Sequence, residues 1–255
     1  MQIYVCVKHV PDSAAHIHIL DDIRIDDDVA FLLNPYDEHA VTEAVAIKEQ
    51  YSDAEIIAVT VGKVDAENTL RSAMAMGADR GILVNAESPC DAMATARALA
   101  AAIKADGTPG IVLTGKESID AEGMQTQFRL GALLNMPVVT NAAKLILEGD
   151  TARITCELSG GITRTFKATL PCVVGAGRGL NVPGYPTLPA IIKSKKKPVK
   201  TLSQKDLDIP EATGSSELVK LAPLTKTRSP KEISGSPAKM AEQIIQVIKT
   251  EGGLA

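Results

Sequence analysis

Residues 55–84 read EIIAVTVGKVDAENTLRSAMAMGADRGILV and contain a complete β-α-β unit. Residues 55–61 and 80–84 are continuous apolar strands, and a helix is predicted between them, from about residue 65 to Met76. Gly77 is suited to be its left-handed terminal residue. Short apolar strands that alternate with helices are typical of a parallel sheet that is buried on both faces and joined by right-handed crossovers.

The same alternation continues on both sides of this unit. Upstream, a strand is predicted over residues 2–10, and a helix begins after Asn34, which can cap it, with Pro35 at its first position. Asp37 in the first turn complements the helix dipole. Downstream, the predicted elements are a helix at 91–105, a strand at 110–114 and a helix at about 122–135. The order predicts an α/β fold built on a parallel sheet.

The hydrophobic pattern changes to period two in the second half of the chain, which predicts an antiparallel meander. Its strands are expected at 142–148, 152–158 and 162–169, separated by glycine-containing turns. Residues 171–176 are expected to form a last buried strand, and residues 177–190 a loop rich in Gly and Pro. These elements complete a first domain.

The chain is predicted to divide into this domain, at residues 1–190, and a C-terminal extended arm at residues 191–255. Residues 191–237 carry many Lys, Ser, Thr and Pro residues and few apolar clusters, so they cannot bury a core of their own. An amphipathic helix is predicted at 238–250. It can pack back on the first domain or on another chain, and we favour another chain.

The composition argues against several classes of function. The formal net charge of −4 and the isoelectric point near 5.6 argue against a nucleic-acid partner. The four cysteines are scattered without a CxxC pair, so disulfide, zinc and iron–sulfur sites lack support and a reducing compartment fits best. No run of about 18 apolar residues occurs, so no membrane insertion is expected. The N-terminal run lacks the features of a signal peptide, and a cytoplasmic location is expected.

Two glycine-rich segments are interpreted as loops or turns. Residues 175–179 (GAGRG) follow a hydrophobic strand as a dinucleotide fingerprint does, but Leu180 stands where the third glycine belongs and no helix can follow. Residues 159–163 (SGGIT) are similar to the pyrophosphate loop of adenine-nucleotide hydrolases. The Asp of that loop is absent here, and the segment falls in a turn of the meander.

The segment at 115–126 (GKESIDAEGMQT) is more informative, because it leaves the end of a parallel strand and enters a helix. Ligands of open α/β sheets bind at such carboxyl ends. Amides at the start of the helix can hold a phosphate, as can the hydroxyl of Thr126, and Gln125 offers both donors and acceptors. A polar loop that only caps the helix explains the segment equally well.

Two further groups of polar residues have an ordinary explanation. The four histidines lie at spacings that give weak support to a metal site, and no nucleophile with its base is recognisable, so no catalytic residue is predicted. The lysine run from Lys193 to Lys197 is either a solvated edge or a positive surface on which an acidic partner lands.

Five segments together resemble the beta-subunit family of the electron-transfer flavoproteins. They are VKHVPD (7–12), NPYDEHAV (34–41), AMGADR (75–80), GKESIDAEGMQT (115–126) and YPTLPAIIKSKKK (185–197). Each segment is short, but all five occur in order and at spacing similar to that of the family. The resemblance covers nearly the whole chain.

This resemblance implies a Rossmann-like domain of the adenine nucleotide alpha hydrolase type that has lost hydrolysis. Such a subunit binds AMP, or a second FAD in electron-bifurcating relatives that also use NADH, while the redox FAD is held with or by an alpha subunit. Carried over by position, the nucleotide site comprises Cys6, Asn34, Pro35, Tyr36, Asp37, Val61, Gly115, Lys116, Glu117, Ser118, Ile119, Asp120, Ala121, Glu122, Gly123, Met124, Gln125 and Thr126.

The resemblance also implies an electron carrier without catalytic residues of its own. A recognition loop at about 184–193, with Tyr185, an anchoring Leu188 and the lysines Lys193 and Lys196, is expected to dock on acyl-CoA or other flavin dehydrogenases. A nucleotide-hydrolysing enzyme on the same fold is the alternative from another class.

The chain departs from the family pattern at a few positions. Val182 and Gly184 replace charged residues, and Gln127 replaces the glycine that follows Gln-Thr at the start of the helix. Because the first turn of that helix keeps Thr126, the sequence favours AMP over a second FAD.

Overall fold

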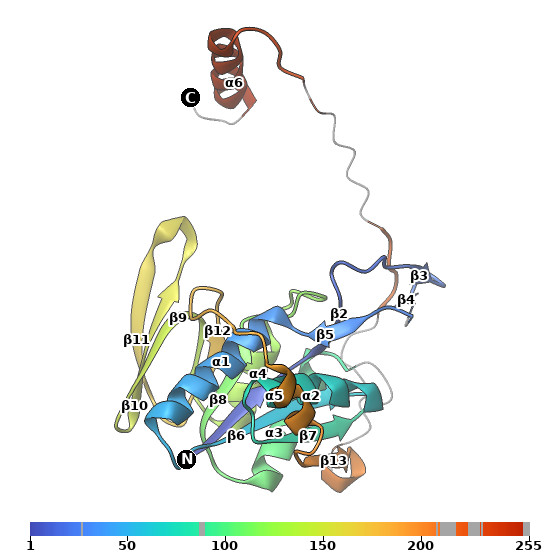
Figure 1. Cartoon of the computed structure of the whole chain (residues 1–255), viewed down its shortest axis with the longest axis vertical. Coiled ribbons are helices and arrows are strands. Elements are labelled where there is room, and N and C mark those ends of the chain that lie inside the picture. The colour runs from blue at the N-terminus through green and yellow to red at the C-terminus, as the bar shows by residue number, and fades with distance from the viewer. Residues whose placement is uncertain are drawn as a thin grey trace.

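The computed structural model describes residues 1–26, 28–86, 90–207, 209, 218–223, 230 and 232–251. Within them the chain forms one nine-stranded sheet in the order β11-β10-β9-β12-β8-β1-β6-β7-β13, with helices packed against it (Figure 1). The strands are β1 Gln2–Cys6, β6 Glu55–Gly62, β7 Arg80–Asn85, β8 Pro109–Gly115, β9 Val138–Glu148, β10 Thr151–Glu157, β11 Thr163–Thr169, β12 Val173–Ala176 and β13 Val199–Ser203. The helices are α1 Pro35–Gln50, α2 Glu67–Met76, α3 Ala92–Asp106, α4 Thr126–Leu134, α5 Leu188–Ser194 and α6 Pro237–Glu251.

The sheet combines a parallel and an antiparallel part. Neighbouring strands from β9 through β12, β8, β1, β6 and β7 to β13 are parallel. Beyond β9, the strands β10 and β11 continue as antiparallel neighbours. The prediction of a Rossmann-like α/β fold is therefore confirmed, and so is the meander.

The two faces of the sheet bury different side chains. Along β1, Ile3 and Val5 belong to a core that includes side chains of α1 and α2. Tyr4 and Cys6 point the other way, into a core that includes side chains of α3 and α4. Successive residues of a strand face opposite sides of the sheet. Because both sides are buried, both sets of residues are apolar, and the strand is a continuous apolar run in the sequence.

The structure differs from the prediction after the first strand and before helix α4. Residues 2–10 are not one strand: β1 ends at Cys6, and β2 His9–Pro11 pairs with β5 Phe31–Leu33 in a separate two-stranded sheet. A second small hairpin joins β3 Ile19–Leu20 to β4 Arg24–Ile25. Helix α4 begins at Thr126, later than the predicted residue 122, so the loop before it is longer.

The arm predicted from residue 191 onward begins with regular structure. The supposed loop at 184–193 runs into α5, and β13 joins the main sheet as a parallel neighbour of β7. The sequence hides β13 because this edge strand, VKTLS, includes exposed polar residues and has no continuous apolar run.

The predicted C-terminal helix is present as α6, and Figure 1 shows it set apart from the sheet. Its side chains Ile244, Ile245 and Ile248 are exposed. Part of the arm, including residues 210–217, lies outside the described residues. Packing of α6 on another chain stays a prediction.

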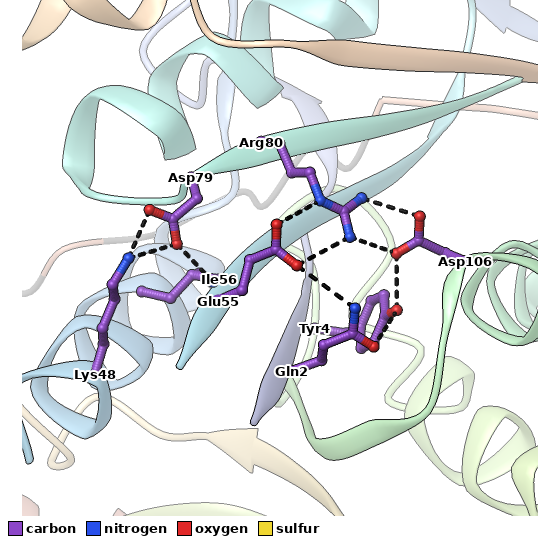
Figure 2. A network of polar contacts seen from close by, with 8 residues as sticks. All are labelled: Gln2, Tyr4, Lys48, Glu55, Ile56, Asp79, Arg80 and Asp106. Carbon is purple, nitrogen blue, oxygen red and sulfur yellow. Dashed lines mark hydrogen bonds and ion pairs between the residues drawn. The ribbon is translucent and has the colours of Figure 1, made fainter. Parts of the chain in front are cut away.

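A network of polar contacts ties together the amino ends of the parallel strands (Figure 2). The guanidinium of Arg80, at the start of β7, donates to both carboxylate oxygens of Glu55 at 2.9 and 3.2 Å, and to those of Asp106 at 3.0 and 2.7 Å. The hydroxyl of Tyr4 donates to Asp106 at 2.8 Å. One cation thus connects β6, β7 and the end of α3.

The neighbouring residue Asp79 ties α1 into the same end of the sheet. Its carboxylate accepts from Lys48 Nζ at 2.6 and 2.7 Å and from the backbone amide of Ile56 at 2.8 Å (Figure 2). Asp79 and Arg80 both belong to the AMGADR segment, which therefore has a structural role at the end of the sheet opposite the cavity described below.

Replacing the central cation should destabilise the fold. We expect Arg80→Met to lower the free energy of unfolding by about 3 kcal/mol, because it leaves the largely buried Asp106 carboxylate without its partner. Denaturant unfolding measures this change. Arg153→Met is the matched control, because the Arg153–Glu148 pair is about half exposed and its loss should cost less than about 1 kcal/mol.

The same comparison has a pH dependence. Hydrogen bonds from Arg80 hold the pKa of Glu55 below its usual value, so the pair stabilises the fold above about pH 4 and this stabilisation is lost as the pH falls through the lowered pKa. The difference between wild type and Arg80→Met should therefore shrink in acid. A difference that stays constant down to about pH 2 would contradict this assignment.

Candidate nucleotide-binding site

A cavity of about 1010 Å³ opens at the carboxyl ends of β1, β6 and β8. The chain passes from β1 to β6 and β7 on one side, then returns to β8 on the other side of β1. This reversal is the topological switch point at which open α/β sheets bind ligands. The cavity therefore lies where ligands bind in folds of this class.

Most of the residues that the sequence singled out meet at this cavity. The lining includes Cys6, Asn34, Asp37, Val61, Gly115, Lys116, Glu117, Ser118, Asp120, Ala121, Gly123, Met124, Gln125 and Thr126. They come from strand ends, the start of α1 and the β8–α4 loop, which are far apart in the sequence and adjacent in space.

Four of the singled-out residues lie beside the cavity and do not line it. Pro35 is the first residue of α1. The ring of Tyr36 is buried, with Lys116 Nζ 5.1 Å and Arg178 Cζ 5.2 Å from its centre. Ile119 and Glu122 are in the β8–α4 loop, and Glu122 has a positive φ of 48°.

The side chain of Asn34 does not cap α1 as expected. Asn34 occupies the cap position, but its amide donates to the carbonyl of Glu117 at 2.9 Å and its Oδ1 accepts from the amide of Ile119 at 3.2 Å. The cap prediction was wrong because a tertiary partner competes for the same side chain. Asn34 thereby fixes the β8–α4 loop to the start of α1.

Asp37 also turns inward, although its position in the first turn suggested a dipole role. Its Oδ2 accepts from the amide of Lys8 at 2.7 Å and its Oδ1 accepts from the amide of Gly115 at 2.9 Å. The residue is 5% exposed. Burial raises the pKa of Asp37 to about 7, against the lowering effect of these amides.

The close contact with Asp37 explains why β8 ends in glycine. A Cβ atom on Gly115 would lie 2.4 Å from Asp37 Oδ1 and 2.6 Å from Tyr36 Cβ. Gly123, in the middle of the same loop, has open space around it, with nothing within 4 Å of such an atom. A side chain would therefore clash at position 115 but not at position 123.

This difference gives a matched pair of substitutions. We expect Gly115→Ala to displace the start of α1 from the end of β8 and to lower the melting temperature by several degrees. Gly123→Ala should leave the melting temperature unchanged within error. Thermal denaturation measures the difference. Equal behaviour of the two variants would show that the contact with Asp37 is unimportant.

The titration of Asp37 should be visible in the stability of the fold. Because its folded pKa of about 7 lies above its unfolded value, the group contributes stability at low pH, and this contribution is lost as the pH rises from about 4 to about 7. We expect Asp37→Asn to lack this component in unfolding curves measured across that range. Asp150→Asn, in an exposed turn, should keep it, and a wild-type slope in Asp37→Asn would contradict the assignment.

The β8–α4 loop is held over the cavity at several points. Gln127 Nε2 donates to the carbonyl of Lys116 at 2.9 Å. Lys8 Nζ lies 2.7 Å from the carboxylate of Asp120 and 3.2 Å from the hydroxyl of Ser118. These contacts close one wall of the cavity without filling it.

Helices α3 and α4 both begin at the cavity, and their first turns differ in their capacity to bind an anion. At α3, the Asp91 carboxylate already accepts from the amides of Met93 and Ala94 at 2.9 and 2.8 Å. At α4, Gln125 makes no side-chain capping bond and the first turn has no acidic residue. The start of α4 therefore offers amides to a phosphate, and the start of α3 does not.

Some residues at the cavity were not singled out from the sequence. Lys8 and His9 line it because β1 stops at Cys6, a break that the continuous pattern of residues 2–10 concealed. The ring of His9 stacks on Phe31 with centroids 4.6 Å apart, and its Nδ1 lies 2.7 Å from Thr69 Oγ1. Burial lowers the pKa of His9, which favours a neutral ring in the cavity wall.

The residues expected to dock on partners lie outside this cavity. Tyr185 is fully exposed, and Leu188 is 70% exposed at the first position of α5. Lys193 and Lys196 are also exposed, in and just after α5. They belong to a surface separate from the nucleotide cavity.

These features define a doubly wound α/β domain with a ligand-sized cavity at its topological switch point. The family model described as Electron transfer flavoprotein domain matches residues 23–207. The chain belongs to the family of electron transfer flavoprotein beta subunits and has the role of an electron carrier. The resemblance found in the sequence is thereby confirmed.

Three relatives illustrate the match. An electron transfer flavoprotein subunit beta of Bacillus subtilis (strain 168) is 35% identical over 257 residues, covering 98% of each chain. The human subunit beta is 34% identical over 259 residues, covering 99% of this chain and 98% of the relative. A mitochondrial subunit beta of Oryza sativa subsp. indica is 36% identical over 258 residues, covering 98% of each chain. Among the described residues, no helix has the length and apolar character needed to cross a membrane.

Proposed function

We propose that this chain forms a heterodimer with an electron-transfer flavoprotein alpha subunit and holds one AMP as a structural ligand. The redox FAD is held with or by the alpha subunit, and it exchanges electrons with acyl-CoA or other flavin dehydrogenases. In this proposal the chain binds and positions, and performs no bond-making step itself.

The open first turn of α4 carries the AMP assignment. Amides at the start of α4 and the hydroxyl of Thr126 would hold the phosphate, because α4 has no capping side chain of its own. The carboxylate of Asp91 occupies the corresponding amides of α3. A nucleotide with one phosphate uses this arrangement fully, and the adenosine part would lie against the ends of β1 and β6.

A second FAD in this chain, with NADH as reductant, is the alternative. The cavity of about 1010 Å³ is at the upper end of the range of about 300–1000 Å³ that is usual for small-molecule sites, so it is larger than AMP requires. A dinucleotide carries a second phosphate, however, and the amides at the start of α3 are already taken by the Asp91 carboxylate, so they offer no second anion site.

Docking on dehydrogenases is assigned to the exposed surface that includes Leu188. Leu188 and Tyr185 are prominent apolar side chains, and Lys193 and Lys196 lie close by in the sequence. A small apolar anchor beside positive charge suits a transient contact that forms quickly with an acidic partner.

Identifying the bound nucleotide tests the proposal directly. We expect the chain coexpressed with its alpha subunit to purify as a yellow heterodimer that releases one FAD and one AMP on denaturation, as measured by absorbance and mass spectrometry. The chain expressed alone should carry no flavin.

Two FAD and no AMP per heterodimer would establish the bifurcating alternative instead. A stable yellow monomer would overturn the heterodimer proposal. Turnover of ATP by the purified chain would favour a nucleotide-hydrolysing enzyme.

A further inference from the structure

The exposed docking surface has very little core beneath it. We define the docking segment as residues 182–193. Its side chains Val182, Tyr185 and Leu188 are 90%, 100% and 70% exposed. Between residues 182 and 186, no hydrogen bond to the rest of the described chain is formed. Something other than apolar burial must therefore fix this segment.

At its amino end, the segment is fastened to α1 by Asn181. The Nδ2 of Asn181 donates to the carbonyl of His39 and to Glu43 Oε2, both at 3.0 Å, and its Oδ1 lies 3.1 Å from His39 Nδ1. Both polar atoms of the amide are used, so the side chain has one well-defined position. Leu180, just before it, packs against the core.

At its carboxyl end, the segment is fastened to α2 by two cations. One comes from α2 and caps α5, and the other follows α5 and caps α2. Arg71 of α2 donates to the carbonyls of Ser194 and Lys197 at 2.8 and 2.6 Å, at the end of α5. Lys197 Nζ donates to the carbonyls of Met74 and Ala78 at 2.9 and 2.7 Å, at the end of α2. Cations at helix carboxyl ends donate to carbonyls that have no partner within the helix, and they interact favourably with the negative end of the helix dipole.

Two further observations show that this contact is built into the fold. Arg71 is itself oriented by Glu67, whose Oε1 accepts from Nε at 3.0 Å and from Nη2 at 2.6 Å. Ser194, the last residue of α5, is only 2% exposed. The carboxyl end of α5 is thus buried against α2, while its amino end projects into solvent.

We infer that Asn181, Arg71 and Lys197 are positioning residues for partner docking, which hold segment 182–193 in its binding conformation from both ends. This inference rests on the proposed docking role of Leu188. A segment held in place before binding loses less conformational freedom when the partner arrives, which strengthens a small interface without enlarging it.

The inference also divides the lysine run into two classes. Lys193, Lys195 and Lys196 are exposed and free to face a partner's acidic surface. Lys197 turns inward to α2, and its role is to hold α5. Two lysines that are two positions apart therefore give a matched pair with the same change of charge.

The test uses the purified heterodimer and an acyl-CoA dehydrogenase that reduces it. We expect Lys197→Met, Arg71→Met and Asn181→Ala each to raise the KM for the flavoprotein about tenfold, the ratio expected for loss of a charge-assisted or paired hydrogen bond, with kcat and the flavin spectrum unchanged. Leu188→Ala should raise the same KM. Lys195→Met should change it by less than about threefold, and only at low salt, because that charge is screened.

The outcomes separate the inference from the function on which it rests. If Leu188→Ala leaves the KM unchanged, the docking role itself is wrong. If Leu188→Ala raises the KM but Lys197→Met and Arg71→Met behave like Lys195→Met, the docking role stands and the positioning role is overturned. If a variant fails to assemble, Arg71→Lys and amide hydrogen exchange across residues 188–194 in the folded heterodimer decide, with faster exchange at unchanged melting temperature expected.

Discussion

The carboxylate of Asp37 is the contact on which the ligand-facing end of the molecule depends. It accepts one amide from Lys8, just beyond β1, and one from Gly115, at the end of β8. Both amides lie where a strand ends, and a buried backbone amide needs a hydrogen-bond partner. A buried side chain from a third element satisfies both amides, fixes α1 across the opening and leaves the space beyond free for a ligand.

The cost of this arrangement is visible in the same residue. Burial raises the pKa of Asp37, so the ionised carboxylate is held there at the expense of stability, and the amides offset only part of that effect. Glycine at position 115 is part of the same arrangement, because any larger residue would contact the carboxylate. The opposite ends of the strands show a contrasting solution. There, Arg80 lies between Glu55 and Asp106, and the opposite charges satisfy one another.

The sequence predicts those parts of the fold in which a residue's environment follows from its own strand or helix. Apolar runs such as residues 55–61 predict buried parallel strands because both faces of such a strand meet helices. The prediction failed where a side chain serves a distant partner: Asn34 has the identity of a helix cap, but the carbonyl of Glu117 and the amide of Ile119 take its side chain. It also missed β13, because the sequence VKTLS resembles the rest of the polar arm and only pairing with β7 marks it as a strand.

The lysine run shows most clearly how tertiary context assigns different roles to identical residues. In sequence, Lys195, Lys196 and Lys197 are equivalent, and all of them suit a positive surface for an acidic partner. In the structure, Lys197 reaches the free carbonyls at the end of α2, and Arg71 reaches those at the end of α5. An electron carrier must release each partner after transfer, so its docking surface has to be small, and a small surface binds specifically only if its shape is fixed beforehand. In the docking role proposed for Leu188, capping contacts at two helix ends would supply that fixed shape and leave the apolar anchor exposed. The same reasoning accounts for the exposure of Leu188 at the amino end of a helix whose carboxyl end is buried.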